Sequence, residues 1–385
     1  MEQNPDSKKI LFIYYKLFKP GGVARVLTSL ANELCEAGYE VTILVLMSNK
    51  SSFFNLDSRV KILNIDTFSH WGFQKINVNI DKYLSRLPAR KSIKNYIYDF
   101  GQWEMLSKWL KKNHKNYDLI ISSWYKLSSQ IARNKTIAAK TIAWEHANFE
   151  VGGKLWKDLL RKNYKNFKAV VCLNSPSLAH YKQINNQSFL IANLIGFPFE
   201  NFVSEKIENK KNDLIFVGRL DSDKNVQESL EILKNVDIKN FKFKIIGDGP
   251  AKSKLEKYLE NSSDLKNKVQ LLGAKNLDEI YESLSNSKAF LFTSKTECLP
   301  TVLIEANLTA NALISYDCKY GPSDIVNQQN GYLIPMHDKK MFAEKLQYLI
   351  DNPHVLEELN KSSYKESAKW RKEKIIQQWK NLIDN

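Results

Sequence analysis

The segment LIFVGRLDSDKN, residues 214–225, places the apolar run LIFV directly before a polar turn and the start of a helix. A short apolar run of this kind is typical of a strand of a parallel sheet and its crossover helix. Arg219 leaves the end of the predicted strand and Lys224 stands just before the helix. Ligands of open α/β sheets bind at the carboxyl edge. The segment therefore predicts an α/β fold with two cations at a binding edge.

Apolar runs of strand length recur along the chain on both sides of this segment. Downstream they lie at residues 241–247, 269–273 and 289–294, and upstream at residues 9–15, 39–47, 60–65, 118–124, 141–147 and 169–175. Helical stretches separate them, and this alternation predicts parallel sheets. We therefore expect two doubly wound Rossmann-like domains that face each other across a cleft.

The length of 385 residues favours two domains, because one hydrophobic core seldom grows to that size. Charge balance shifts and polar residues accumulate near residues 195–200. We predict a basic N-terminal domain over residues 1–195 and a second domain over residues 196–365. Residues 366–385 are predicted as a C-terminal helix that packs back on the N-terminal domain.

The cysteine pattern and the first residues bear on the compartment. Cys35, Cys172, Cys298 and Cys318 are far apart and form no C-x-x-C pair, which disfavours a zinc site or a disulfide framework and fits a reducing compartment. The first residues, MEQNPDSKKILFIYYK, contain only a short apolar run. This run is too short for a signal peptide or a membrane span, so we expect a cytoplasmic protein that is not integral to a membrane.

The excess of positive over negative charge is confined to the N-terminal half. Residues 1–195 contain 29 Lys and Arg against 14 Asp and Glu, which accounts for the whole formal excess of +15. Residues 82–115 and 154–168 both read as basic amphipathic helices with interleaved aromatic residues. Such helices suit the anionic inner face of the cell membrane. A solvated helix face is the alternative, and nucleic acid is disfavoured because no nucleic-acid-binding motif accompanies the charge.

Two carboxylates flank the start of another predicted helix in TECLPTVLIEAN, residues 296–307. Pro300 suits the first helical position, where its missing N–H costs nothing. The N–H groups of the first turn would then attract an anion. Glu297 lies in the loop before this helix and Glu305 lies inside it, so the two carboxylates have different tasks. Carboxylates accept hydrogen bonds from sugar hydroxyls, whereas Arg219 and Lys224 suit phosphate, and together they match a nucleotide-sugar.

With these residues the sequence resembles the retaining glycosyltransferases of the GT-B fold, glycosyltransferase family 4. The family signature is G-R-L-x-x-x-K followed by E-x7-E, and its two parts are found here at residues 218–224 and 297–305. A Gly-Gly loop, Gly21-Gly22, and a Glu-His pair, Glu145-His146, occupy the expected order. The sequence CLPT after Glu297 departs from the commoner core and is similar to the subset that builds bacterial surface glycans, often from UDP-sugars.

The resemblance implies roles for individual residues. The first domain would bind the acceptor and the second the nucleotide-sugar. Catalytic roles fall on Arg219, Lys224, Glu297 and His146, and donor contacts are expected from Gly21, Gly22, Gly218, Arg219, Lys224, Leu299, Pro300, Thr301 and Glu305. The first Glu would lie beside the transferred sugar and the second on the ribose. The loop with Gly321 and Asp324 would be a further loop over the site.

The triplet Asp221-Ser222-Asp223 reads as D-x-D, the metal signature of the other major glycosyltransferase fold. It falls inside residues 218–224, which we call the Arg-Lys motif. The two cations of this motif, Arg219 and Lys224, can neutralise a diphosphate without a metal. We therefore expect Asp223 to help to start the helix, and we expect neither an essential metal nor another cofactor.

Alternative interpretations remain at this point. A nucleotide-sugar epimerase of the same fold would use the donor alone, and a basic module that binds nucleic acid or a partner would carry the motifs without using them. Arg219 and Lys224 could pair with Asp221 and Asp223 at the surface, and His146 could be a core residue. Glu305 could balance a helix dipole. Donor sugar, acceptor and linkage do not follow from the sequence.

Overall fold

The computed structural model describes residues 7–19, 21–47, 51–65, 90–151 and 153–385, together with the single residues 79 and 82. Side chains are described for all of these except residues 90–96 and 153–156. The chain divides into two compact units. The first comprises Met1–Leu173, Ser177–Ile191 and Trp379–Asn385, and the second comprises Asn174–Pro176 and Ala192–Gln378.

The first unit is built on a seven-stranded sheet in the order β3-β2-β1-β4-β5-β6-β7, and every pairing is parallel. Its strands are β1 (Lys9–Tyr14), β2 (Glu40–Val45), β3 (Lys61–Asn64), β4 (Leu119–Ser122), β5 (Thr141–Glu145), β6 (Ala169–Cys172) and β7 (Ser188–Leu190). Its helices are α1 (Gly22–Glu36), α3 (Arg90–Asn113), α4 (Tyr125–Ile131), α5 (Lys135–Ala138), α6 (Gly153–Arg161) and α7 (Ser175–Lys182).

The second unit contains a six-stranded parallel sheet in the order β10-β9-β8-β11-β12-β13. Its strands are β8 (Lys211–Val217), β9 (Lys242–Ile246), β10 (Val269–Gly273), β11 (Ser287–Phe292), β12 (Ala312–Tyr316) and β13 (Gly331–Ile334). Its helices are α8 (Val226–Leu233), α9 (Lys252–Glu260), α10 (Ser263–Lys266), α11 (Leu277–Asn286), α12 (Thr301–Leu308), α13 (Pro322–Ile325), α14 (Lys339–Asp351) and α15 (Pro353–Glu366), followed by α16 (Lys372–Asp384).

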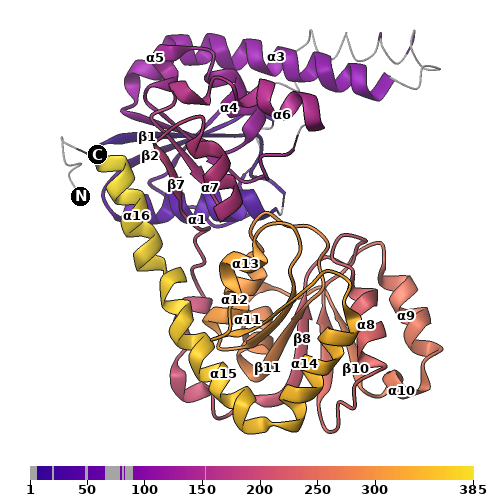
Figure 1. Cartoon of the computed structure of the whole chain (residues 1–385). Helices are drawn as coiled ribbons and strands as arrows, with labels where there is room; N and C mark the ends of the chain where they lie inside the picture. The colour runs from indigo at the N-terminus through magenta and orange to yellow at the C-terminus, as the bar shows by residue number, and fades with distance from the viewer. Residues whose placement is uncertain are drawn as a thin grey trace. The chain divides into compact units, whose positions relative to one another are not determined.

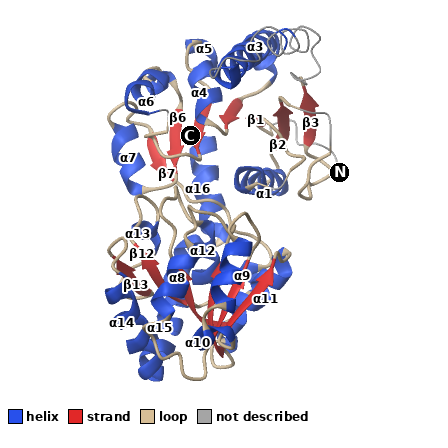
Figure 2. Ribbon diagram, turned by 90° about the vertical axis from the view of Figure 1, so that its right-hand side faces the viewer, coloured by secondary structure: helices blue, strands red, loops and turns tan. Residues whose placement is uncertain are grey.

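Helices cover both faces of each sheet, which explains why the strands are apolar throughout. In the first unit α3, α4 and α5 lie on one side of the sheet and α1 on the other (Figure 1). In the second unit α8, α9 and α14 pack on one face, and α11 and α12 lie on the opposite face (Figures 1 and 2). The predicted α/β class with two doubly wound sheets is confirmed.

The order of strands positions the candidate sites. In the first sheet the chain direction across the sheet reverses between β1 and β4, and in the second sheet it reverses between β8 and β11. Loops diverge at such a switch point and leave a crevice beyond the carboxyl ends of the strands. We therefore expect ligands to bind at the segments after β1 and β4 and at those after β8 and β11.

Candidate functional site

The loops after β8 and β11 are joined to each other at the switch point of the second unit. The Lys295 amide donates to the Asp223 carbonyl at 2.8 Å, and the Thr293 hydroxyl donates to the Lys224 carbonyl at 3.3 Å and the Asn225 carbonyl at 3.2 Å. These bonds place the Arg-Lys motif of one loop beside Glu297 of the other.

Asp221 organises the turn that carries both cations. Its carboxylate accepts hydrogen bonds from the backbone N–H groups of Asp223 and Lys224, each at 3.0 Å, and from the Arg219 guanidinium. Burial acts to raise the pKa of Asp221, but these donors outweigh it and hold that pKa below its ordinary value. The helix starts at Val226 after Asn225, which has a positive φ of 52°. The expectation that Asp223 starts the helix was therefore wrong, because Asn225 stands at the N-cap and no side chain accepts a cap hydrogen bond there.

The Lys224 ammonium forms an ion pair with the Glu297 carboxylate, and both side chains are partly buried. The alternative that Lys224 pairs with Asp223 is therefore wrong, whereas Arg219 does pair with Asp221. The Arg219 side chain remains 70% exposed. An exposed guanidinium and a lysine that is held by one carboxylate form a cationic rim that a diphosphate can reach.

The helix that follows Glu297 begins one residue later than the sequence suggested. Pro300 stands at the N-cap and α12 begins at Thr301, so Pro300 does not occupy the first helical position. Leu299 is buried and Glu305 is 4% exposed inside the helix. Gly321, at φ +91°, lies so close that a Cβ would stand 2.6 Å from Pro300 Cδ. Gly321 thus packs closely against the loop before α12. Glu297 and Glu305 lie in separate environments.

The glycines around the Arg-Lys motif serve backbone packing. A Cβ on Gly247, at φ +149°, would stand 1.8 Å from the Gly218 carbonyl oxygen, and one on Gly249 would stand 2.4 Å from the Leu220 carbonyl oxygen. A Cβ on Gly218 would stand 3.3 Å from the Phe216 ring. The loop after β9 therefore packs closely against the backbone of the Arg-Lys motif.

The Gly21-Gly22 loop of the first unit has a different character. A Cβ at either glycine would meet no atom of the described chain within 4 Å, and Gly21 has an extended φ of −179° that any residue can adopt. Neither the backbone conformation nor neighbouring atoms thus require a glycine there. Open space in front of the N-terminus of α1 is compatible with close approach of a ligand.

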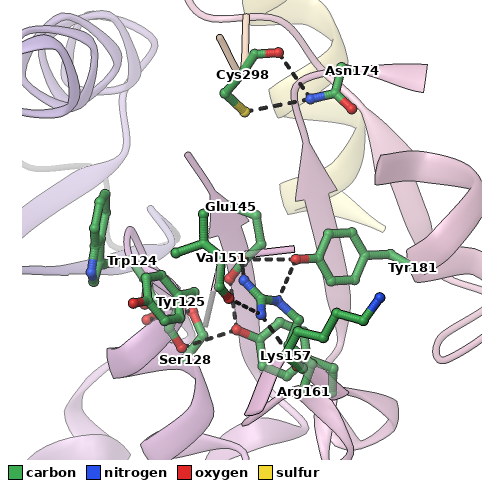
Figure 3. A network of polar contacts seen from close by, with 12 residues as sticks. Trp124, Tyr125, Ser128, Glu145, Val151, Lys157, Arg161, Asn174, Tyr181 and Cys298 are labelled. Carbon is green, nitrogen blue, oxygen red and sulfur yellow. Dashed lines mark hydrogen bonds and ion pairs between the residues drawn. The ribbon is translucent and has the colours of Figure 1, made fainter. Parts of the chain in front are cut away.

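Glu145 ends β5 inside a buried polar network (Figure 3). Its carboxylate accepts hydrogen bonds from the Tyr164 hydroxyl at 2.7 Å and the Tyr181 hydroxyl at 3.0 Å, and it lies 3.6 Å from the Arg161 guanidinium. Arg161 also donates to the Tyr181 hydroxyl at 2.8 Å and to the Val151 carbonyl at 3.0 Å. Burial raises the pKa of Glu145, although Arg161 and the tyrosines act in the opposite direction. This network fixes the end of β5.

His146 follows immediately, and its ring lies against an aromatic ring. The Trp144 ring lies 4.2 Å from the His146 ring, centroid to centroid. Burial lowers the pKa of His146 to about 3, so the imidazole is neutral at physiological pH. Its buried Nε2 has no hydrogen-bond partner among the residues that the structure describes. A neutral imidazole in this position can exchange a hydrogen bond with a ligand but cannot supply positive charge.

The structure corrects one part of the basic surface expected of residues 154–168. Arg161 is completely buried in the Glu145 network, so it belongs to the core and not to a basic surface. Lys162 and Lys165 of this stretch are exposed, whereas the side chain of Lys154 lies outside the described residues. In the other stretch, residues 83–89 lie outside the described residues, and α3 begins at Arg90.

The predicted site residues fall into two groups. Gly218, Arg219, Lys224, Glu297, Leu299, Pro300, Thr301 and Glu305 belong to the second unit, and Gly21, Gly22 and His146 to the first. Within the second unit the structure brings Arg219, Lys224 and Glu297 to one switch point. Sequence reasoning missed Asp221 as the organiser of this turn and the tyrosines that hold Glu145. An Asp three residues before Lys224 was the available signal for the former, and no local signal marked the latter.

No group of three or more His, Cys, Asp or Glu side chains in the described part of the chain could hold a metal ion. No described helix is both long enough and apolar enough to cross a bilayer. The expectation of a metal-independent site stays a prediction.

Comparison with protein families assigns most of the chain. The family model described as "Glycosyltransferase Family 4" matches residues 20–188, and the model described as "Glycosyl transferases group 1" matches residues 199–369. One match covers most of the first sheet and the other covers the second sheet with the Arg-Lys and Glu motifs.

Two curated relatives align over nearly their full length. An "Amylovoran biosynthesis glycosyltransferase AmsD" from Erwinia amylovora is 26% identical, over 98% of this chain and 99% of that protein. From Campylobacter jejuni, the α-1,4-N-acetyl-D-galactosaminyltransferase whose name specifies GalNAc-α-(1→4)-GalNAc-α-(1→3)-diNAcBac-PP-undecaprenol is 28% identical, over 97% of this chain and 98% of that protein.

Solved structures share the fold over the whole chain. The crystal structure of TarM has a TM-score of 0.73 at 17% identity and covers 98% of this chain and 99% of that chain. The apo lipopolysaccharide outer core galactosyltransferase WaaB gives 0.71 at 17% identity, with 98% and 99% covered. HepE from Anabaena, in complex with UDP and glucose, gives 0.69 at 16% identity, again with 98% and 99% covered.

Proposed function

Because the chain belongs to the glycosyltransferases of family 4 with the GT-B fold, we propose that it moves a hexose or N-acetylhexosamine from a nucleotide-sugar to a growing surface glycan. A UDP-sugar is the favoured donor, since the neighbour HepE was crystallised with UDP. The acceptor is a surface-glycan, lipopolysaccharide or lipid-linked saccharide, as the names of the relatives suggest. Transfer proceeds with retention at the anomeric carbon, in keeping with the family.

The observation that carries this proposal is the contact of Lys224 with Glu297 beside Arg219 at the switch point of the second sheet. Arg219 and Lys224 supply positive charge where negative charge develops on the departing diphosphate. As the diphosphate enters, the Lys224 ammonium exchanges the Glu297 carboxylate for phosphate oxygens. Glu297 is then released toward a hydroxyl of the donor sugar. One ion pair thereby couples nucleotide binding to orientation of the sugar.

The remaining residues orient the reactants. Glu305 inside α12 accepts hydrogen bonds from ribose hydroxyls, and the N–H groups at the start of α12 face the phosphates. The neutral imidazole of His146 offers a hydrogen bond to the sugar. The acceptor hydroxyl forms the new bond to the anomeric carbon while the bond to the diphosphate breaks, and the leaving phosphate oxygen takes the hydroxyl proton. Fixed cations make a divalent metal unnecessary for this step.

We further propose that the enzyme works in the cytoplasm, at the inner face of the cell membrane. The supporting observation is the confinement of the formal excess of +15 to residues 1–195. Exposed lysines on α3, and Lys162 and Lys165 in the segment after α6, suit anionic lipid. The charge serves the membrane and not nucleic acid.

A donor screen tests the function first. UDP-, GDP- and ADP-sugars are added separately and the melting temperature is followed; one nucleotide class should stabilise the protein. Replacing both cations, Arg219→Ala with Lys224→Ala, should abolish the stabilisation and the transfer, whereas Lys254→Ala with Lys266→Ala on the exposed faces of α9 and α10 should retain both. EDTA should leave transfer intact.

Three outcomes would contradict the proposal. Unchanged diphosphate affinity in the Arg219→Ala, Lys224→Ala variant would show that these two cations do not bind the diphosphate. Loss of activity in EDTA would revive the metal-binding reading of Asp221 and Asp223. Isomerisation of the donor without any acceptor would identify an epimerase instead.

A further inference from the structure

A pocket of about 550 Å³ lies on the first unit, between the C-terminal half of α3 and the segment that includes the end of α4 and the start of α5. These helices lie on the same side of the first sheet (Figure 1). None of the predicted donor or catalytic residues lines the pocket. Its lining residues are all within the described part of the chain.

The floor of the pocket is apolar and belongs to the core. Leu106 and Leu110 of α3 face Ile131 of α4 and Ile137 of α5, and all four side chains are buried in one hydrophobic cluster. The same cluster includes apolar side chains of the sheet strands, among them Leu11 and Ile120. A site with this floor favours a ligand with hydrocarbon at one end.

The rim of the pocket is cationic. It carries Lys108, Lys111, Arg133 and Lys135 against the single carboxylate of Glu104, which pairs with Lys108 at 2.7 Å. The Arg133 guanidinium lies over the Trp103 ring at 5.5 Å from its centroid. Such stacking orients the guanidinium plane and leaves its N–H groups available at the edge. The rim therefore favours an anion with several oxygen acceptors.

The surface beside the pocket suits a lipid interface. Phe100, one turn before Trp103 on α3, is 53% exposed, and the two rings lie 5.5 Å apart. Exposed aromatic rings next to lysines are typical of segments that enter the headgroup layer of a membrane. This pair adjoins the cationic rim on the same helix.

We propose that this pocket binds one anionic phospholipid of the membrane, with the headgroup phosphate on the Arg133 side of the rim and the first acyl carbons on the apolar floor. Charge complementarity selects the phosphate, and the apolar floor selects lipid over a free phosphate ion. A nucleic acid would use the rim but has no hydrocarbon to place against the apolar floor. The proposal deepens and rests on the membrane association proposed above, and it does not depend on the transfer reaction.

A lipid that forms no bilayer separates pocket binding from general attraction to a charged surface. Dihexanoyl-phosphatidylglycerol below its micelle concentration is titrated into the full-length protein by calorimetry. Saturable binding to one site is expected, with dihexanoyl-phosphatidylcholine and inorganic phosphate each at least tenfold weaker. Vesicles of phosphatidylglycerol, tested in parallel, report membrane association by itself.

Matched variants locate the site. Arg133→Glu with Lys135→Glu should weaken monomeric lipid binding at least tenfold, whereas the same charge change in the segment after α6, Lys162→Glu with Lys165→Glu, should leave it unchanged. Ser107→Trp fills the pocket without altering charge and should also abolish monomeric lipid binding. Stabilisation by the nucleotide-sugar donor should be normal in all three, which shows that each variant is folded.

Equal lipid affinity in Ser107→Trp and wild type would overturn the proposal, because the lipid would then lie elsewhere. Equal affinity for inorganic phosphate and the lipid would also overturn it and leave a simple anion site. If wild-type protein binds neither vesicles nor monomeric lipid while donor binding and transfer are intact, the membrane proposal fails and the transfer proposal stands.

Discussion

Glu297 and Glu305 lie on one β11–α12 segment but have different surroundings. Glu297 stands on the loop and contacts the Lys224 ammonium, whereas Glu305 is enclosed within α12. A carboxylate that exchanges partners as the donor binds can act in the transition state, whereas one built into a helix binds ground state and transition state alike. The two residues should therefore affect different kinetic constants.

We predict that Glu297→Gln lowers kcat at saturating donor by about tenfold or more. Its affinity for nucleoside diphosphate should be unchanged or higher, because Lys224 no longer has a competing carboxylate. Glu305→Gln should chiefly raise the KM for the donor. Steady-state kinetics and calorimetry with the diphosphate measure both effects. Loss of diphosphate affinity in Glu297→Gln, with retention in Glu305→Gln, would reverse the assignment.

His146 gives a pH dependence at the same scale. Its folded pKa of about 3 lies below the ordinary value of 6.5, so its stabilising contribution is present above pH 6.5 and is lost as the pH falls toward 3. Between pH 7 and pH 5 the wild type should lose up to about 2 kcal/mol more unfolding free energy than His146→Gln. Denaturant unfolding of both proteins at the two pH values measures this difference, and parallel losses would show that His146 titrates normally.

At the scale of elements, two glycine-containing turns precede helices for different reasons. A side chain at Gly247 would collide with the Gly218 carbonyl, whereas one at Gly22 would meet open space at the start of α1. The turn after β9 is thus a packing device for the Arg-Lys loop. The turn before α1 leaves room in front of a helix terminus, where a ligand can come close to the backbone of the protein.

We predict opposite phenotypes for alanine at these two positions. Gly247→Ala should lower the melting temperature by several degrees, because a positive φ and a backbone collision must both be relieved. Gly22→Ala should leave the melting temperature within about 2 °C of wild type and still reduce transfer by about tenfold, because the added methyl group enters the ligand's space. Full activity in Gly22→Ala would remove that loop from the donor site.

At the scale of the whole molecule, the last residues of the chain complete the first unit. Trp379 of α16 is 1% exposed, and its ring lies 5.0 Å from Trp144, which in turn lies against His146. The Tyr39 hydroxyl donates to the Asp384 carboxylate at 2.9 Å, and Lys8 donates to the Ile383 carbonyl at 3.0 Å. A predicted site residue near the middle of the sequence is thus supported by the C-terminal helix.

We predict that Trp379→Ala destabilises the first unit by about 3–5 kcal/mol, since it removes a large buried ring, and that Trp379→Phe costs less. Hydrogen exchange should report the loss in β5 and its neighbours and leave the second sheet protected. The exposed neighbour Gln378→Ala serves as the control. Uniform loss of protection in both sheets would show that the two units unfold as one.

The sequence by itself determined the α/β class, most strands of both sheets and the family, because these depend on short-range patterns. Apolar runs of strand length, helical periodicity, the spacing of Arg219 from Lys224 and the spacing of Glu297 from Glu305 are each visible within a short stretch of sequence. Short strands were missed, namely β7, β12 and β13, because the sequence around them resembles loops and helix ends. Their place in the sheet comes from pairing with neighbours already formed.

Only the tertiary structure decided which charges are paired and which face the solvent. Arg161 reads as one more cation of a basic helix, yet it enters the core because Glu145, Tyr164 and Tyr181 arrive there from other elements. Lys224 likewise contacts Glu297 because β8 and β11 are neighbours in the sheet, although α8, α9, α11 and the strands between them separate the two residues in the chain. Burial of a charge is stable only with a partner in place, and long-range packing selects that partner.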